Sequence, residues 1–215
     1  MTAADLDRLA AARAIAVVRV ERADDTGPVV DALRRGGMTA IELTWTTPEA
    51  ATGLAAAREQ HGPELLLGAG TLRSPADVEE AVAAGADFVV SPHFEPTLCA
   101  AMVASGRLAL PGVLTPTEVA AALDAGVEAV KLFPSSLGGV SHMKALWGPF
   151  PGLAVVPTGG IARHNAAEWL AAGALAVGVG GELCPPEAIA GQRWDLLTER
   201  AADLIGALDQ DRSRR

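Results

Sequence analysis

The sequence predicts an α/β protein that folds as one closed (β/α)8 barrel over residues 1–215, with an additional helix at about residues 3–13. Three observations lead to this prediction. Eight short apolar runs alternate with amphipathic stretches, the runs follow one another at even spacing, and no long linker or low-complexity segment separates them. An open, doubly wound sheet is the alternative, but the first strand–helix junction lacks the glycine fingerprint of that fold.

The apolar runs have the length of buried parallel strands, and turn residues bound each of them. They cover residues 14–20, 40–45, 65–72, 88–92, 109–114, 129–133, 153–158 and 174–179. The stretches between them carry signals of helix starts, because Ser74-Pro75 and Thr115-Pro116 place a capping residue directly before a proline. Glycines close the helical stretches at positions 36, 37, 85, 106, 126 and 173. The tail after Asp209 is expected to fray.

Composition and charge exclude several classes of protein. Half of the residues are hydrophobic, which excludes a disordered chain, and the formal net charge of −9 argues against nucleic acid or an anionic membrane as a partner. The two cysteines, Cys99 and Cys184, are too few for a disulfide scaffold. No apolar run reaches the ~18 residues of a membrane span, and the N-terminus lacks the features of a secretory signal. A cytoplasmic protein is therefore expected.

Two charged residues lie inside apolar runs, where a charge is costly. Glu42 is part of AIELTW, and Lys131 is part of AVKLFPSS. Lysine is rare in this chain, because 15 of the 17 basic residues are Arg and only Lys131 and Lys144 are Lys. Arg stays protonated, whereas a Lys amine can lose its proton and attack a carbonyl carbon. Lys131 is therefore a candidate nucleophile, and Glu42 a candidate general acid or base.

In a ring of eight strands the second and the sixth lie opposite each other, and alternate residues of each strand point inward. We expect Glu42 and Lys131 to face one another across the barrel mouth, with space between them. An amine facing a carboxylate in this way suits Schiff-base chemistry with proton transfer. A purely structural ion pair is the alternative for both residues.

Other polar and small residues follow the expected strand ends. Thr71 and Thr158 could bind a substrate carboxylate or carbonyl, or could be only turn residues. Arg19 could hold a carboxylate or balance the charge of Glu42. Glycines after the last two strands favour a phosphate site made of backbone N–H groups, although Glu182 stands beside them. They lie at positions 159, 160, 178, 180 and 181. No histidine or cysteine pattern indicates a metal site.

Six motifs, in this order, resemble those of a known family. They are IELTWTTPEA, GAGTLRSPADVEEAVAAGADFVVSPH, PGVLTPTE, VKLFPSS, MKALWGPFP and VPTGGI. Together they resemble the 2-keto-3-deoxy-6-phosphogluconate (KDPG) aldolase family, whose members also cleave 4-hydroxy-2-oxoglutarate. The resemblance extends from about residue 5 to about residue 205.

The resemblance implies a class I aldolase that uses no metal or other cofactor and forms a homotrimer of barrels. It implies that Lys131 forms the Schiff base with pyruvate and that Glu42 is the general acid/base, acting through a water molecule. The residues implied to contact the substrate are Thr71, Phe133 and Thr158. Those implied to cradle its phosphate are Gly159, Gly160, Gly180 and Gly181.

Two departures from the family pattern concern the substrate. Many members carry Arg four residues after the catalytic Glu, where this chain has Thr46. Some members with Thr there carry an Arg at the end of the first strand, so we expect Arg19 to bind the substrate carboxylate, with Thr46 kept as a substrate-binding candidate. Gly181 stands where Ser is frequent, so one hydroxyl contact to phosphate is lost, and such a contact contributes less than about 1.5–3 kcal/mol.

The expected function is cleavage of 2-dehydro-3-deoxy-6-phosphogluconate to pyruvate and D-glyceraldehyde 3-phosphate, with 4-hydroxy-2-oxoglutarate as a further substrate. The FPSS motif also resembles the branch that acts on the galactonate epimer, and the missing Ser keeps an unphosphorylated 2-keto-3-deoxy acid open. Two readings from other classes are a non-covalent isomerase that uses Glu42 and Lys131 as acid and base, and a non-catalytic phosphate-binding barrel.

Overall fold

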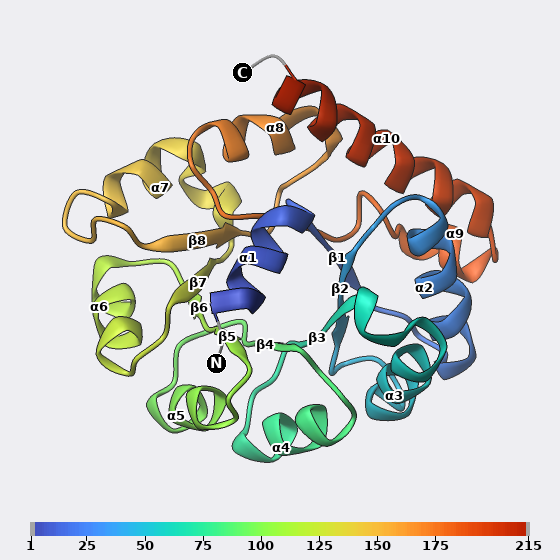
Figure 1. The fold of residues 1–215 in the computed structure, drawn as a ribbon, viewed down its shortest axis with the longest axis horizontal. Coiled ribbons are helices and arrows are strands. Elements are labelled where there is room, and N and C mark those ends of the chain that lie inside the picture. The colour runs from blue at the N-terminus through green and yellow to red at the C-terminus, as the bar shows by residue number, and fades with distance from the viewer. Residues whose placement is uncertain (1–2, 214–215) are drawn as a thin grey trace.

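The structure is a computed structural model that describes residues 3–213, and it is an α/β fold with parallel strands in the centre and helices around them (Figure 1). The strands are β1 (Ala14–Val18), β2 (Ala40–Thr44), β3 (Leu66–Gly70), β4 (Phe88–Val90), β5 (Leu108–Leu110), β6 (Gly112–Val113), β7 (Ala129–Leu132), β8 (Ala154–Pro157) and β9 (Val177–Val179). The α-helices are α1 (Ala3–Ala12), α2 (Thr26–Arg35), α3 (Ala50–His61), α4 (Pro75–Ala83), α5 (Pro96–Ala104), α6 (Pro116–Asp124), α7 (Gly139–Leu146), α8 (Arg163–Ala171), α9 (Pro186–Ala190) and α10 (Trp194–Ser213). Within residues 3–213 no helix is both long enough and apolar enough to cross a membrane.

The strands form two hydrogen-bonded parallel sheets rather than the single ring of eight that the sequence predicts. The larger sheet has the order β5-β4-β3-β2-β1-β9, and the smaller has the order β6-β7-β8. The expected strand at residues 109–114 is divided at Pro111, so that β5 pairs with β4 while β6 pairs with β7. Proline has no N–H to donate to a ladder, which explains why the strand is interrupted there. An isolated parallel bridge, Thr158 to Gly178, links the end of β8 to β9.

The helix α1 closes the end of the strands at which the chain enters them (Figure 1). Its Leu9 is fully buried and belongs to an inner apolar cluster with Ala40 and Leu66, the first residues of β2 and β3. Phe88, also fully buried, fills the same layer. A second, larger cluster lies between the strands and the surrounding helices. The inner cluster thus makes the starts of β2 and β3 apolar, and on β4 it extends to the last residue, Val90.

Side chains alternate between the two faces of a strand, and this alternation decides what reaches the interior. Ala40 faces the inner cluster, so Glu42 and Thr44 on the same strand face the interior as well. On β7, Ala129 belongs to the inner cluster, and Lys131 follows two residues later. The two charged residues therefore enter the same space from strands of different sheets.

The predicted helix signals are present. The N-terminal helix is observed as α1, and Ser74 and Thr115 each form a capping box at the start of α4 and α6. The closing glycines Gly85 and Gly126 adopt positive φ values of 95° and 89°. The helix α10 continues to Ser213, so fraying of the tail after Asp209 stays a prediction, and residues 214–215 lie outside the described part of the chain.

The capping box of α6 generates a prediction for the acid stability of the fold. Partial burial acts to raise the pKa of Glu118, but hydrogen bonds from the N–H of Leu114 and from Thr115 outweigh it and lower that pKa. A carboxylate with a depressed folded-state pKa stabilises the fold above its unfolded pKa, and this contribution is lost as the pH falls through the folded pKa. We expect Glu118→Gln to lower the free energy of unfolding at about pH 7 and to have little effect at about pH 2. Urea titrations of both proteins at the two pH values measure this, and an equal loss at both would contradict it.

Candidate active site

Lys131 and Glu42 face each other inside the molecule, as the sequence predicts, but the expected space between them is absent because they lie at ion-pair distance. The Nζ atom of Lys131 lies 3.6 Å from Oε1 of Glu42, and the two side chains are only 7% and 3% exposed. Lys131 is held in place by its backbone N–H, which donates to the carbonyl oxygen of Pro111 at 3.0 Å. Glu42 pairs in register with Val17 on β1 and Gly68 on β3. The strand ladders therefore fix both Cα positions, and the two side chains converge from opposite walls.

The carboxylate of Glu42 is incompletely paired. Its Oε1 atom is buried and has no hydrogen-bond partner among the described residues. The separation of 3.6 Å from Nζ exceeds the 2.7–3.2 Å usual for an N–H···O hydrogen bond. Most buried polar atoms in proteins are hydrogen-bonded, so an exception calls for an explanation. A reactive group that must move protons is such an explanation, and a pair kept only for stability is not.

The ring of Phe133 lines one side of the amine. Nζ lies 5.3 Å from the ring centroid, within the range of a cation–π contact when the amine is charged. Phe133 follows β7 and is only partly buried, so it borders the outer part of the site. The structure thus brings Phe133 together with Lys131 and Glu42.

A row of hydroxyl groups continues from Glu42 toward the carboxyl end of β2. Thr44 is 1% exposed, and its Oγ1 lies 3.1 Å from Oγ1 of the exposed Thr46 and 3.5 Å from that of Thr47. Thr47 in turn accepts a hydrogen bond from the N–H of Val20 at 3.3 Å. Thr44 was not among the predicted site residues, although its spacing of two from Glu42 places it on the same strand face.

Arg19 follows the end of β1 and is exposed, whereas the charge of Glu42 is faced by Lys131. In residues 3–213 Arg19 forms no ion pair with Glu42, so the alternative that it balances this carboxylate is wrong. A guanidinium group that is not engaged by Glu42 can bind an anion that enters the mouth.

The two predicted threonines follow β3 and β8. Thr71 has a positive φ of 58° and is partly buried, and Thr158 is 8% exposed. A Cβ atom placed on Gly178 would lie only 2.3 Å from Oγ1 of Thr158. Gly178 on β9 therefore leaves the space that the Thr158 hydroxyl occupies.

The predicted glycine loops lie beside each other because the Thr158–Gly178 bridge joins β8 to β9. Gly159 and Gly160 have φ values of 90° and 82°, which residues other than glycine rarely adopt. The carbonyl oxygen of Gly159 accepts hydrogen bonds from the Ser135 hydroxyl at 2.7 Å and the Ser136 N–H at 3.1 Å. These two serines of the FPSS motif thus hold the loop after β8.

The second loop is a tight turn, in which the carbonyl oxygen of Gly180 accepts from the N–H groups of Leu183 and Cys184 at 2.9 and 3.0 Å. Gly181 is exposed, and a Cβ on it would meet no atom within 4 Å. The loop therefore has room for a larger residue at this position.

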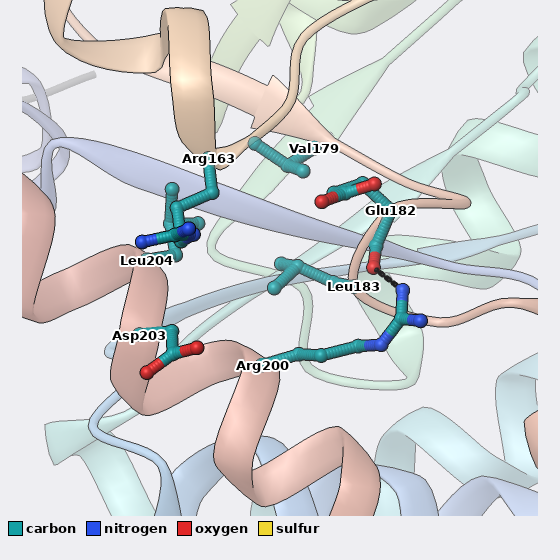
Figure 2. Close-up of a pocket in the computed structure, with 7 residues that line it drawn as sticks. All are labelled: Arg163, Val179, Glu182, Leu183, Arg200, Asp203 and Leu204. Carbon is teal, nitrogen blue, oxygen red and sulfur yellow. Dashed lines mark hydrogen bonds between the residues drawn. The ribbon is translucent and has the colours of Figure 1, made fainter.

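A pocket lies on the outer side of this loop (Figure 2). It lies between the loop after β9, the start of α8 and the helix α10, and neither Lys131 nor Glu42 lines it. Arg200 donates a hydrogen bond to the carbonyl oxygen of Glu182 at 2.5 Å, shown dashed in Figure 2. Two Arg and two acidic side chains line the pocket, so their formal charges cancel. Glu182, which is awkward beside an anion site, belongs to this outer pocket.

The cysteines offer no nucleophile near neutral pH. Burial raises the pKa of the Cys184 thiol to about 12, although Arg200 acts to lower it. Burial also raises the pKa of Cys99. Over the part of the chain that the structure describes, no group of three or more His, Cys, Asp or Glu side chains is arranged to hold a metal ion.

Comparisons with known proteins agree with this architecture. The sequence profile described as KDPG and KHG aldolase matches residues 6–200. A 2-dehydro-3-deoxy-phosphogluconate aldolase from Treponema pallidum is 37% identical over 91% of this chain and 95% of that protein. A 2-dehydro-3-deoxy-6-phosphogalactonate aldolase from Escherichia coli is 32% identical over 90% of this chain and 93% of that protein.

A crystal structure gives the same result at the level of the fold. It is that of a KDPG aldolase from Legionella pneumophila with pyruvate captured as a covalent carbinolamine intermediate. It is 34% identical, its TM-score is 0.86, and the match covers 93% of this chain and 97% of that one. The present chain belongs to the KDPG and KHG aldolase family.

The buried pair generates a stability prediction. Replacing a buried ion pair by apolar residues of similar size is often neutral or stabilising by about 1–4 kcal/mol, whereas removing one partner costs about 3–5 kcal/mol. We expect the double variant Glu42→Leu/Lys131→Met to be at least as stable as the unmodified protein, and Glu42→Leu alone to be much less stable. Urea unfolding monitored by circular dichroism measures this. A strongly destabilised double variant would show that the pair is a stabilising ion pair.

Proposed function

We propose that this protein is a class I aldolase that cleaves 2-dehydro-3-deoxy-6-phosphogluconate to pyruvate and D-glyceraldehyde 3-phosphate. The observation that carries the proposal is the buried approach of Lys131 Nζ to Glu42 Oε1, at 3.6 Å, with this oxygen lacking a hydrogen-bond partner among residues 3–213. The names of the relatives and the carbinolamine captured in the Legionella pneumophila enzyme support the same chemistry.

In the proposed reaction the neutral amine of Lys131 attacks the C2 ketone of the substrate and forms a carbinolamine. Loss of water then gives a protonated imine between Nζ and C2. Glu42 supplies the proton for the departing hydroxyl and removes protons from the amine, because its carboxylate is the ionisable group beside Nζ. The apolar wall below the pair limits the access of bulk water to these steps.

The protonated imine draws in the electron pair of the C3–C4 bond when that bond breaks. The C4 hydroxyl loses its proton, C4 leaves as the aldehyde, and the electrons are held as an enamine on C2 and C3. Protonation of C3 and hydrolysis of the imine release pyruvate and free Lys131. Glu42 is the residue that we propose to move these protons, in part through a water molecule.

The remaining residues are proposed to hold the substrate. Arg19 binds the carboxylate next to the ketone. This role is supported by its place after β1 and by the lack of an ion pair between Arg19 and Glu42 in residues 3–213. Thr46, Thr71 and Thr158 line the mouth, and Phe133 packs against the pyruvoyl group. The two adjacent glycine loops, at Gly159-Gly160 and Gly180-Gly181, present backbone N–H groups to the distal phosphate.

We further propose that residues 1–215 form one domain in which the two sheets close into an eight-stranded barrel. The chain runs directly from β5 into β6 across Pro111, and the Thr158–Gly178 bridge spans the other junction. We also propose a homotrimer, and assembly into an oligomer is supported by a similar chain, with a TM-score of 0.87, in a protein cage designed by fusing symmetric oligomeric domains. Two free, buried cysteines suit a cytoplasmic location.

Two substrate alternatives have specific support. The galactonate epimer is favoured by relatives named 2-dehydro-3-deoxy-6-phosphogalactonate aldolase from Rhizobium meliloti and Escherichia coli. An unphosphorylated acid is favoured by the absence of a hydroxyl at Gly181. A KHG/KDPG aldolase from Escherichia coli, 33% identical, supports 4-hydroxy-2-oxoglutarate as a further substrate.

The proposal predicts a covalent adduct on one of the two lysines. Borohydride reduction in the presence of pyruvate should attach a reduced pyruvoyl group to Lys131, as found by peptide mass spectrometry. Lys131→Arg should form no adduct and should lose turnover, because a guanidinium stays protonated. Lys144→Arg is the matched control, since Lys144 is an exposed residue of α7. This variant should still form the adduct on Lys131 and keep its turnover.

The absence of an adduct in the folded protein would favour a non-covalent isomerase or a binding barrel instead. Where the adduct forms, the aldehyde half of the substrate is decided by comparing turnover of four compounds. These are the two phosphorylated epimers, the unphosphorylated acid and 4-hydroxy-2-oxoglutarate. A preference for the unphosphorylated acid would overturn the phosphate assignment.

The open space at Gly181 predicts how phosphate affinity can be raised. A serine fits there without displacing an atom, because a Cβ would meet nothing within 4 Å. Its hydroxyl would add one hydrogen bond to the phosphate, worth about 1 kcal/mol, so we expect KM for the phosphorylated substrate to fall about fivefold in Gly181→Ser. KM for an unphosphorylated substrate should stay unchanged. An equal effect on both substrates would contradict a phosphate at this loop.

A further inference from the structure

Gly70, the last residue of β3, lies directly against the carboxylate of Glu42. A Cβ atom built on Gly70 would stand 1.9 Å from Oε1, 2.3 Å from Cδ and 2.5 Å from Cγ of Glu42. No side chain larger than hydrogen can occupy this position while Glu42 keeps its present conformation. We propose that Gly70 is a positioning residue for the reaction, because its missing side chain is the space in which the Glu42 carboxylate stands beside Lys131.

The close approach of Gly70 and the charge of Lys131 bound the Oε1 side of this carboxylate. Oε1 is buried and has no hydrogen-bond partner in the described part of the chain. Its surroundings are the backbone of Gly70 on one side and Nζ of Lys131, at 3.6 Å, on the other. Glu42 as a whole is 2% exposed, so bulk water does not surround the group.

A methyl group at Gly70 would therefore move the carboxylate rather than the backbone. The atoms that it would overlap are at the free end of a side chain with three rotatable bonds, so the strands can stay in place while that end shifts. The expected consequence is a folded protein in which the acid/base has left its position. A displacement of about 1 Å in a catalytic group can reduce the rate about 100-fold.

Gly68 provides a matched comparison on the same strand and the same face. A Cβ on Gly68 would lie 2.1 Å from Cε2 and 2.2 Å from Cζ of Phe88. Phe88 is fully buried in the inner apolar cluster, and its rigid ring cannot withdraw as a carboxylate can. Gly68→Ala should therefore lower the stability of the fold by displacing Phe88, whereas Gly70→Ala should lower the reaction rate by displacing the Glu42 carboxylate.

The test compares Gly70→Ala with Gly68→Ala, and it rests on the proposed function. We expect Gly70→Ala to lose about 100-fold in kcat with little change in KM and to keep a melting temperature close to that of the unmodified protein. It should still yield the borohydride-reduced pyruvate adduct on Lys131 at the end point. Exchange of the pyruvate methyl protons with deuterium, followed by NMR, should slow in parallel with kcat. Gly68→Ala should show the reverse, with a lower melting temperature and kcat within a few-fold.

A shortened carboxylate provides the rescue experiment. Glu42→Asp alone withdraws the carboxylate by one methylene group and should reduce kcat. In Gly70→Ala/Glu42→Asp the shorter side chain no longer overlaps the new methyl group, so kcat should exceed that of Gly70→Ala about tenfold. Unchanged kcat in Gly70→Ala, or a double variant no better than the less active single variant, would overturn the inference.

Stability measurements keep the inference testable if Gly70→Ala folds poorly. In the Glu42→Ala background the overlapping Cγ, Cδ and Oε1 atoms are absent, so adding Gly70→Ala should not lower the melting temperature further. An equal loss with and without Glu42 would assign Gly70 to backbone structure instead. Failure of the proposed function is distinguishable, because it would appear as the absence of a pyruvate adduct in the unmodified protein.

Discussion

The burial of two opposite charges in an apolar interior is the constraint on which the rest of this structure depends. Taking Lys131 and Glu42 out of water is unfavourable, and their mutual attraction offsets that cost only when both are held at the right separation. Separate strands from separate sheets supply that positioning, since each residue is fixed by ladder hydrogen bonds rather than by a loop. The fold therefore holds together an amine and a carboxylate that water would otherwise separate.

Along β2 and β7 the inward-facing residues change from apolar to polar. Leu9 of α1 and Phe88 of β4 fill the amino-terminal end of the interior, so apolar side chains exclude water from below the charged pair. Toward the carboxyl ends of these strands the side chains include hydroxyls and glycines, and hydrogen bonds from Ser135 and Ser136 to Gly159 join the loop after β7 to the loop after β8. The proposed keto-acid substrate is expected to approach the charged pair from this polar end.

Small residues are as important to this site as charged ones. The space taken by the Thr158 hydroxyl exists because β9 has glycine at 178, and the space taken by the Glu42 carboxylate exists because β3 ends in glycine at 70. In a close-packed interior a single methyl group is enough to displace a neighbour. The positions of the functional groups are thus decided by the residues beside them that lack side chains.

The sequence by itself determined the order of strands and helices, the capping residues at Ser74 and Thr115, and the placement of Glu42 and Lys131 on facing strands. These properties are local or follow from the period-two alternation of strands, so apolar patterning is sufficient to predict them. Only the tertiary structure decided that the expected fifth strand divides at Pro111, that Arg19 does not balance Glu42, and that Thr44 joins the hydroxyl row. The contact of Gly70 with Glu42 also belongs to this group, because it depends on the register between β2 and β3 and on the short distance from Gly70 to the Glu42 carboxylate. Such distances arise when strands far apart in the chain pack together, and no local pattern of residues encodes them.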